Sequence, residues 1–147
     1  MCGVALRYPG VQQLIEAFKI CGTSVDGCVK TSKEKLHLYG VHDIADSRGR
    51  LHRSKGVVEK PSPESAPSNL SVVGRYLFTP EIFAIQKETP RGTGGEWQLA
   101  DAMNTLAQNG KLHTYELEGI PFDVGTPEGY WQTLRHYGAK EYGKSFY

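Results

Sequence analysis

The sequence predicts an α/β protein in which a mixed or largely parallel sheet is flanked by helices. Two observations predict it: apolar residues recur at helical spacing in some segments, and short β-rich runs alternate with those segments. A length of 147 residues corresponds to a single domain. With 39% hydrophobic and 22% charged residues, the chain can bury a core.

The first elements follow from periodicity. Apolar residues at i, i+3, i+4 and i+7 from Val11 to Phe18 predict a helix, and Gly22 stands where that helix would stop. Residues 25–29 read as a short strand, and residues 36–44 read as a second extended segment.

The middle of the chain alternates between polar connections and strands. Residues 46–55 are polar and basic and predict an exposed connection, after which a strand resumes at Gly56 and ends at Pro61. Three prolines make residues 61–68 a loop, because proline lacks the N–H that a sheet requires. Residues 69–78 are β-rich and predict the next strand.

The remaining helices carry start and stop signals. Thr79-Pro80-Glu81 predicts an N-cap, a proline at the first helical position and a helix running to about Glu88. An apolar stripe from Leu99 to Leu106 predicts another helix, closed by Asn109-Gly110. Residues 112–117 form a strand, and Thr126-Pro127-Glu128 repeats the capping pattern before a last helix.

Composition excludes several classes of protein. A formal net charge of +1 provides no basic field for nucleic acid, and no apolar run approaches the roughly 20 residues that span a bilayer. The N-terminus lacks the basic and apolar regions of a signal peptide. Three cysteines without a CxxC pair are typical of reduced, structural thiols. The sequence therefore predicts a cytoplasmic protein with no nucleic-acid or membrane partner.

Familiar catalytic motifs are missing from the sequence. The five histidines show no zinc-binding spacing, and no GxSxG motif is present. Residues 92–97 mimic a dinucleotide fingerprint, but Trp97 replaces its third glycine, so a loop leading into a helix is the favoured interpretation.

Two short segments place polar groups where ligands bind to α/β sheets. Glu59-Lys60 puts an acceptor and a cation at the end of a strand, which suits a sugar phosphate and equally suits a solvated charge pair. Asp123 precedes a capped helix and is either an ordinary turn residue or an oxygen ligand for magnesium. Composition alone does not choose between these alternatives.

Six short motifs in a fixed order resemble the bacterial UTP–glucose-1-phosphate uridylyltransferases, which are sugar-phosphate nucleotidyltransferases. The resemblance runs from about Pro9 to the C-terminus. The motifs are Tyr39-Gly40-Val41, Val57-Val58-Glu59-Lys60-Pro61, Ala66-Pro67-Ser68-Asn69-Leu70, Val73-Gly74-Arg75-Tyr76, Gly94-Gly95-Glu96-Trp97-Gln98-Leu99 and Phe122-Asp123-Val124-Gly125.

The resemblance implies a partial nucleotide-diphospho-sugar transferase fold and a reaction class. In that family a sugar 1-phosphate attacks the α-phosphorus of a nucleoside triphosphate and releases pyrophosphate, with positioning and charge neutralisation as the main sources of catalysis. It implies that Tyr39 and Gly40 lie at the sugar, that Glu59 accepts from ring hydroxyls and that Lys60 contacts the phosphate. Asp123 would supply one of two carboxylates for Mg²⁺, which is needed only when a nucleotide is bound.

The sequence also departs from the family. It contains no glycine-rich GxGTRxxPxT loop followed by PK, the part that holds the nucleotide and the second metal carboxylate. We therefore expect residues 1–147 to be one domain resembling the C-terminal, sugar-binding half, truncated relative to the family. It would bind glucose 1-phosphate, contain no complete catalytic centre and have no independent uridylyltransferase activity that makes UDP-glucose.

The missing half leaves three readings of the molecule open. Strand edges that it would cover favour a homodimer of a truncated sugar-phosphate binder. Alternatively, a separate nucleotide-binding half completes an enzyme, or the chain is an interaction protein that binds through the exposed sheet.

Overall fold

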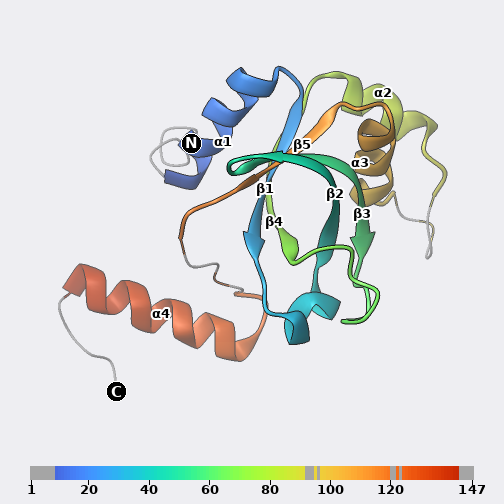
Figure 1. Ribbon diagram of the computed structural model, residues 1–147. Helices are drawn as coiled ribbons and strands as arrows, with labels where there is room; N and C mark the ends of the chain where they lie inside the picture. Colours follow the sequence, from blue (N-terminus) through green and yellow to red (C-terminus); the bar gives the residue numbers. More distant parts are fainter. Residues whose placement is uncertain (1–8, 92–94, 96, 120–121, 123, 143–147) are drawn as a thin grey trace.

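The computed structural model describes residues 9–91, 95, 97–119, 122 and 124–142. Helices and β-strands alternate along the chain, as predicted (Figure 1). In chain order the elements are α1 (Pro9–Cys21), β1 (Ser24–Lys30), the 3₁₀ helix η2 (Lys33–Leu38), β2 (Gly40–Arg48), β3 (Leu51–Glu59), β4 (Leu70–Leu77), α2 (Glu81–Glu88), α3 (Leu99–Gln108), β5 (Leu112–Glu116) and α4 (Pro127–Tyr142).

The five strands form one mixed sheet that closes on itself in the order β1-β4-β2-β3-β5. Only the β1–β5 pair is parallel among the described strands, and the other pairs are antiparallel. The expectation of open strand edges is therefore wrong in part: each described strand has two neighbours, but the pairing between β2 and β4 is incomplete. One seam is narrow: β2 and β4 are paired only at Val41 and Ser71.

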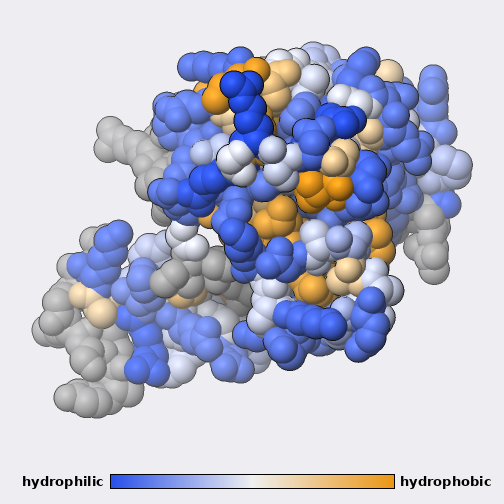
Figure 2. All heavy atoms as spheres, in the orientation of Figure 1, coloured by the Kyte–Doolittle hydropathy of each residue, from blue (hydrophilic) through white to orange (hydrophobic). Residues whose placement is uncertain are grey.

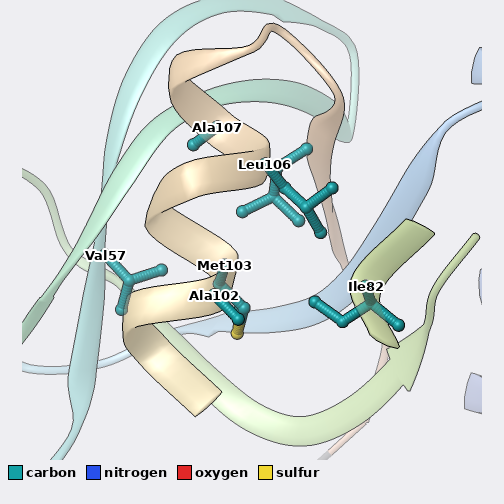
Figure 3. Close-up of a cluster of buried hydrophobic side chains, with 7 residues drawn as sticks. Val57, Ile82, Ala102, Met103, Leu106 and Ala107 are labelled. Atoms are coloured by element: carbon teal, nitrogen blue, oxygen red, sulfur yellow. The ribbon is translucent and has the colours of Figure 1, made fainter. Parts of the chain in front are cut away.

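Helices α2 and α3 cover one side of the sheet with an apolar core (Figure 3). Met103 and Leu106 of α3 are almost completely buried, and they pack with Val57 of β3 and Ile82 of α2. The predicted stripe from Leu99 to Leu106 is thus the buried face of α3, which fixes this helix against the end of β3.

A second apolar cluster lies beneath α1. Leu14 and Ala17 of α1 pack on Val25 of β1, and all three are buried. The last helix, α4, extends away from the strands at the lower left of Figure 1. In the part of the chain that the structure describes, no helix is both long and apolar enough to cross a bilayer.

A buried polar network connects three strands. His42 of β2 donates from Nε2 to Asp26 Oδ2 of β1 at 2.9 Å, and its Nδ1 lies 3.1 Å from Ser54 Oγ of β3. His42 and Asp26 are fully buried. Asp26 Oδ1 has no hydrogen-bond partner among the described residues.

Two predicted segments differ from the structure. Residues 36–44 are not one extended segment, because η2 ends at Leu38 and buries Leu36 before β2 begins at Gly40. Residues 46–55 are not a connection but the tip of a β2–β3 hairpin, turning at Gly49 with a φ of 62°. Polar side chains occupy this tip because its outer face is solvated.

The two repeated capping signals behave differently. At α4 the prediction is confirmed, since the Gly129 N–H donates to Thr126 Oγ1 at 3.1 Å. At α2 it is wrong in detail, since the Thr79 hydroxyl donates to Glu81 Oε1 instead of capping the backbone. The helix still ends at Glu88 as predicted.

Candidate sugar-phosphate site

A hollow of about 330 Å³ opens beside the narrow seam between β2 and β4. Its walls are the start of β2, the end of β3, the middle of β4 and the first turns of α3. Glu59 is the only charged residue among the described residues that line it, so we call it the Glu59 hollow. Figure 2 shows patches of hydrophobic residues on the face of the molecule that is in view, surrounded by hydrophilic residues.

Strand pairing brings the four predicted sugar and phosphate residues together. Gly40 and Glu59 are direct partners across β2 and β3, and the Lys60 N–H donates to Tyr39 O at 3.0 Å. Tyr39, Gly40 and Glu59 line the Glu59 hollow. Residues 19 and 21 positions apart in the sequence thus meet because the hairpin folds one strand onto the other.

Gly40 is needed for space. A Cβ at this position would lie 3.0 Å from Val57 Cγ1 and 3.1 Å from Glu59 Oε2. A larger residue would therefore push the Glu59 carboxylate away from its position and fill part of the hollow.

Lys60 lies beside the Glu59 hollow but is not part of its lining. Its ammonium is 4.0 Å from Glu59 Oε1, and both side chains are more than half exposed. Its backbone has a φ of 47°, a left-handed conformation that costs a non-glycine residue on the order of 1 kcal/mol. The Tyr39–Lys60 backbone hydrogen bond holds this conformation.

Tyr76 of β4 also lines the Glu59 hollow. The residue is 38% exposed, and its partial burial, together with the Asp26 and Glu59 carboxylates, raises the pKa of Tyr76 above its ordinary value, so the phenol stays protonated. The ring stacks on Phe78, with a centroid distance of 5.4 Å and an interplanar angle of 13°. The hollow thus presents an acceptor at Glu59 and a donor at Tyr76.

Asn104 on α3 holds the strand that carries Glu59. Its Oδ1 accepts from the Val57 N–H at 2.6 Å, and its Nδ2 donates to Val57 O at 3.1 Å. Gly56 leaves room for this side chain, since a Cβ there would lie 2.9 Å from Asn104 Oδ1. The amide therefore takes the place of a neighbouring strand at this point.

The predicted metal residue, Asp123, lies outside the described residues. Among the residues that the structure describes, no three His, Cys, Asp or Glu side chains are grouped as a metal site. The Mg²⁺ prediction therefore stays a prediction.

The sequence did not predict that α3 and β4 form part of the wall of the Glu59 hollow. Leu99 and Met103 from α3, and Val72, Gly74 and Tyr76 from β4, line the Glu59 hollow. The motifs at residues 73–76 and 94–99 contained part of this signal, but neither was assigned a role in sugar binding. Trp97 lies outside the lining; it is half-exposed, and the Arg91 guanidinium carbon lies 4.6 Å from its ring centroid.

Comparison with known proteins identifies the family. The sequence profile described as nucleotidyl transferase matches residues 7–140. The chain belongs to the nucleotidyl transferase family. Its α/β fold with a mixed sheet and flanking helices is the one that the resemblance implied.

This nucleotidyl transferase chain is similar to curated uridylyltransferases. It is 38% identical over 138 residues to a UTP–glucose-1-phosphate uridylyltransferase of Bacillus subtilis, covering 94% of this chain and 47% of the relative. It is also 38% identical over 133 residues to UTP–glucose-1-phosphate uridylyltransferase 2 of Staphylococcus saprophyticus, covering 90% of this chain and 46% of the relative. The chain thus spans about half the length of these relatives.

The comparison with solved structures gives the same result, a match to about half of each longer chain. An apo UDP-glucose pyrophosphorylase aligns with a TM-score of 0.86 at 33% identity, covering 91% of this chain and 50% of the other. A UDP-glucose pyrophosphorylase complexed with UDP-glucose aligns with a TM-score of 0.83 at 34% identity, covering 92% and 52%. The nucleotidyl transferase chain therefore has the fold of about half of each pyrophosphorylase chain.

Proposed function

We propose that this nucleotidyl transferase chain binds a sugar 1-phosphate, with glucose 1-phosphate as its ligand, and does not transfer a nucleotidyl group by itself. The observation that carries the proposal is the Gly40–Glu59 pair, which places a carboxylate at the wall of a hollow beside the seam. The names of the relatives, UTP–glucose-1-phosphate uridylyltransferases, support the choice of ligand.

The Glu59 hollow suits a hydroxylated ring. Each carboxylate oxygen of Glu59 can accept hydrogen bonds from ring hydroxyls, and the protonated Tyr76 phenol can donate to a ring oxygen. The missing side chain at Gly40 leaves room for the ring against the backbone, and Tyr39 adds an amphipathic wall. Leu99 and Met103 provide the apolar floor.

Lys60 is the proposed phosphate contact, as the family resemblance implies. Its exposed ammonium lies next to Glu59 and can turn towards a phosphate held outside the Glu59 hollow. Asp123 is the proposed carboxylate for Mg²⁺, which would neutralise phosphate charge when a nucleotide is also present.

The proposed lack of independent transfer rests on the missing GxGTRxxPxT loop. Without that loop the chain has no preorganised cradle for a triphosphate, and a nucleophile without a bound electrophile gives no reaction. The proposed unit is residues 1–147 as one sugar-binding domain.

A second candidate is an enzyme component completed by a separate nucleotide-binding polypeptide. The observation that favours it is the extent of the match, about half of each relative. In that case the isolated chain would bind sugar phosphate, and activity would appear only when the second polypeptide is added.

Calorimetric titration of the full chain with glucose 1-phosphate, and separately with UTP and Mg²⁺, tests the proposal. We expect the sugar phosphate to bind and UTP not to bind. Glu59→Gln should weaken the binding of glucose 1-phosphate by about tenfold, because the amide keeps an acceptor oxygen but loses the charge assistance, worth roughly 1–1.5 kcal/mol.

Glu64→Gln is the matched control, because Glu64 is an exposed carboxylate in the loop after β3 and does not line the Glu59 hollow. It should leave the affinity unchanged. Binding of UTP with release of pyrophosphate by the chain alone would contradict the proposal, and so would equal affinities of wild type and Glu59→Gln.

A further inference from the structure

The outer edge of β3 is only partly covered by another strand. β3 pairs with β2 from Leu51 to Glu59, but with β5 only at residues 51–53. Among the described residues, the later part of β3 therefore has no second strand to pair with its outward N–H and C=O groups. Glu59 stands at the end of this part of the strand.

Asn104 covers the free edge with its amide. Its two hydrogen bonds, from the Val57 N–H at 2.6 Å and to Val57 O at 3.1 Å, are of the kind that a neighbouring strand would make. Val57 lines the Glu59 hollow, and so does Met103, which precedes Asn104 in α3. One side chain thus ties together the walls that β3 and α3 contribute to the hollow.

The close approach of Asn104 depends on Gly56. A Cβ at Gly56 would lie 2.9 Å from Asn104 Oδ1, which is shorter than a Cβ tolerates. Alanine at this position would push the amide away from Val57 without changing the chemistry of the amide. Gly56 therefore offers an independent way of disturbing the same contact.

The Glu59 carboxylate depends on its strand for its position. Among the described residues it accepts no hydrogen bond, and its ion pair with Lys60 spans 4.0 Å between exposed side chains, which holds a side chain weakly. Val57 and Glu59 are two positions apart in a regular stretch of the β2–β3 pairing, so their side chains lie on the same face of the strand. A displacement of Val57 is therefore passed on to Glu59.

We propose that Asn104 is a positioning residue for the sugar, whose amide holds the end of β3 so that Glu59 meets a ring hydroxyl at hydrogen-bonding distance. The inference rests on the proposed function, in which Glu59 is the sugar contact. Asn104 does not line the Glu59 hollow, so it acts through Val57 and Glu59 and not by touching the ligand. Small displacements matter, because a hydrogen bond weakens steeply outside a narrow range of lengths and angles.

Titration calorimetry of the full chain with glucose 1-phosphate measures the effect. We expect Asn104→Ala to weaken binding by about fivefold, at the lower end of the coupling between distinct sites. Thr105→Ala is the matched control, because it removes a side-chain hydrogen bond that stays within α3, and it should leave the affinity unchanged. Melting curves followed by circular dichroism show whether each variant is folded at the titration temperature.

Gly56→Ala is the second variant, and it tests the same contact in a protein that keeps Asn104. Its Cβ displaces the amide oxygen, so we expect the affinity for glucose 1-phosphate to fall in the same direction. This variant decides the question if Asn104→Ala does not fold. Affinities equal to that of wild type in both variants would overturn the inference.

A double-mutant cycle separates positioning from a general loosening of the fold. Asn104→Ala is combined with Glu59→Ala, and the weak binding is followed by NMR at millimolar glucose 1-phosphate. Because Asn104 acts through Glu59, we expect Asn104→Ala to cost less than about twofold once the carboxylate is absent, which is within the scatter of independent sites. The same loss with and without Glu59 would assign the effect to the fold and overturn the positioning role.

The outcomes distinguish this inference from the proposed function. Wild type that binds glucose 1-phosphate, with unchanged affinity in Asn104→Ala and Gly56→Ala, supports the proposed function and overturns the positioning role. Weaker binding in both variants, with no further loss in the absence of Glu59, supports both. Wild type that does not bind glucose 1-phosphate overturns both.

Discussion

Asp26 and His42 form a hydrogen-bonded pair of polar side chains in the protein interior. Their side chains have no exposed surface, and 2.9 Å separates His42 Nε2 from Asp26 Oδ2. A polar group in such a position is tolerated only while its hydrogen-bond partner is present.

We predict that Asp26→Ala lowers the free energy of unfolding by about 1–3 kcal/mol, because it leaves the buried His42 Nε2–H without its acceptor. Urea unfolding followed by circular dichroism measures the change. Asp26→Val combined with His42→Leu should recover most of the loss, since removing both partners leaves no unpaired polar group. A double variant as unstable as the sum of the two single variants would contradict this explanation.

Cys28 is predicted to be unreactive in the folded protein. Burial raises the pKa of its thiol to about 12, so almost no thiolate is present at neutral pH. Iodoacetamide labelling at pH 7.5, resolved by peptide mass spectrometry, should modify the half-buried Cys21 before Cys28. Equal labelling rates at the two positions in the native state would show that β1 opens more readily than its burial indicates.

At the scale of elements, Asn104 joins α3 to β3 through both hydrogen bonds to Val57. We predict that Asn104→Ala lowers the free energy of unfolding by roughly 1–3 kcal/mol, because the Val57 N–H and C=O lose their partner. It should also speed amide exchange at Val57, which NMR measures. Thr105→Ala is the neighbouring control, since the Thr105 hydroxyl only donates to Asp101 O within α3. Unchanged exchange at Val57 in Asn104→Ala would contradict the prediction.

The sequence was sufficient for α3, whose buried residues follow the helical period and form one apolar face. The β-rich run of β4 is also confirmed, although its burial does not alternate along the strand. The β2–β3 hairpin was missed because its tip carries charges on paired positions: Asp46 faces Arg53, and the Arg53 side chain donates to the Asp46 carboxylate at 2.7 Å. Polarity there marks a solvated strand face and not a connection.

The candidate site was predictable only in part. Tyr39, Gly40 and Glu59 came from two motifs, and strand register brought them to one hollow. The contribution of Met103 depends on how α3 packs against the strands in three dimensions, and local sequence spacing does not contain that information.

For the whole molecule, we predict a homodimer in solution. The described strands close into one sheet, and β2 and β4 are paired there at a single position, so we look for the contact outside the sheet. Exposed apolar surface remains on α4, where Tyr130, Leu134 and Tyr137 follow helical spacing and each is more than 40% exposed.

Light scattering measures the mass directly. We expect twice the 16.3 kDa chain mass for wild type and a shift towards the monomer in Leu134→Glu, with an unchanged melting temperature. Lys140→Glu, an exposed position near the end of α4, is the charge control. A wild-type monomer at all concentrations would contradict the prediction.

The closed sheet also sets the order in which this chain can fold. The parallel partner of β1 is β5, and the bond from the Thr114 hydroxyl to Asp26 O spans 88 positions of the sequence. On a ribosome, β1 must therefore wait until residues 112–116 have emerged before its second edge is paired, and long-range pairing of this kind is slow. During synthesis that edge of β1 is the segment most in need of protection from other chains.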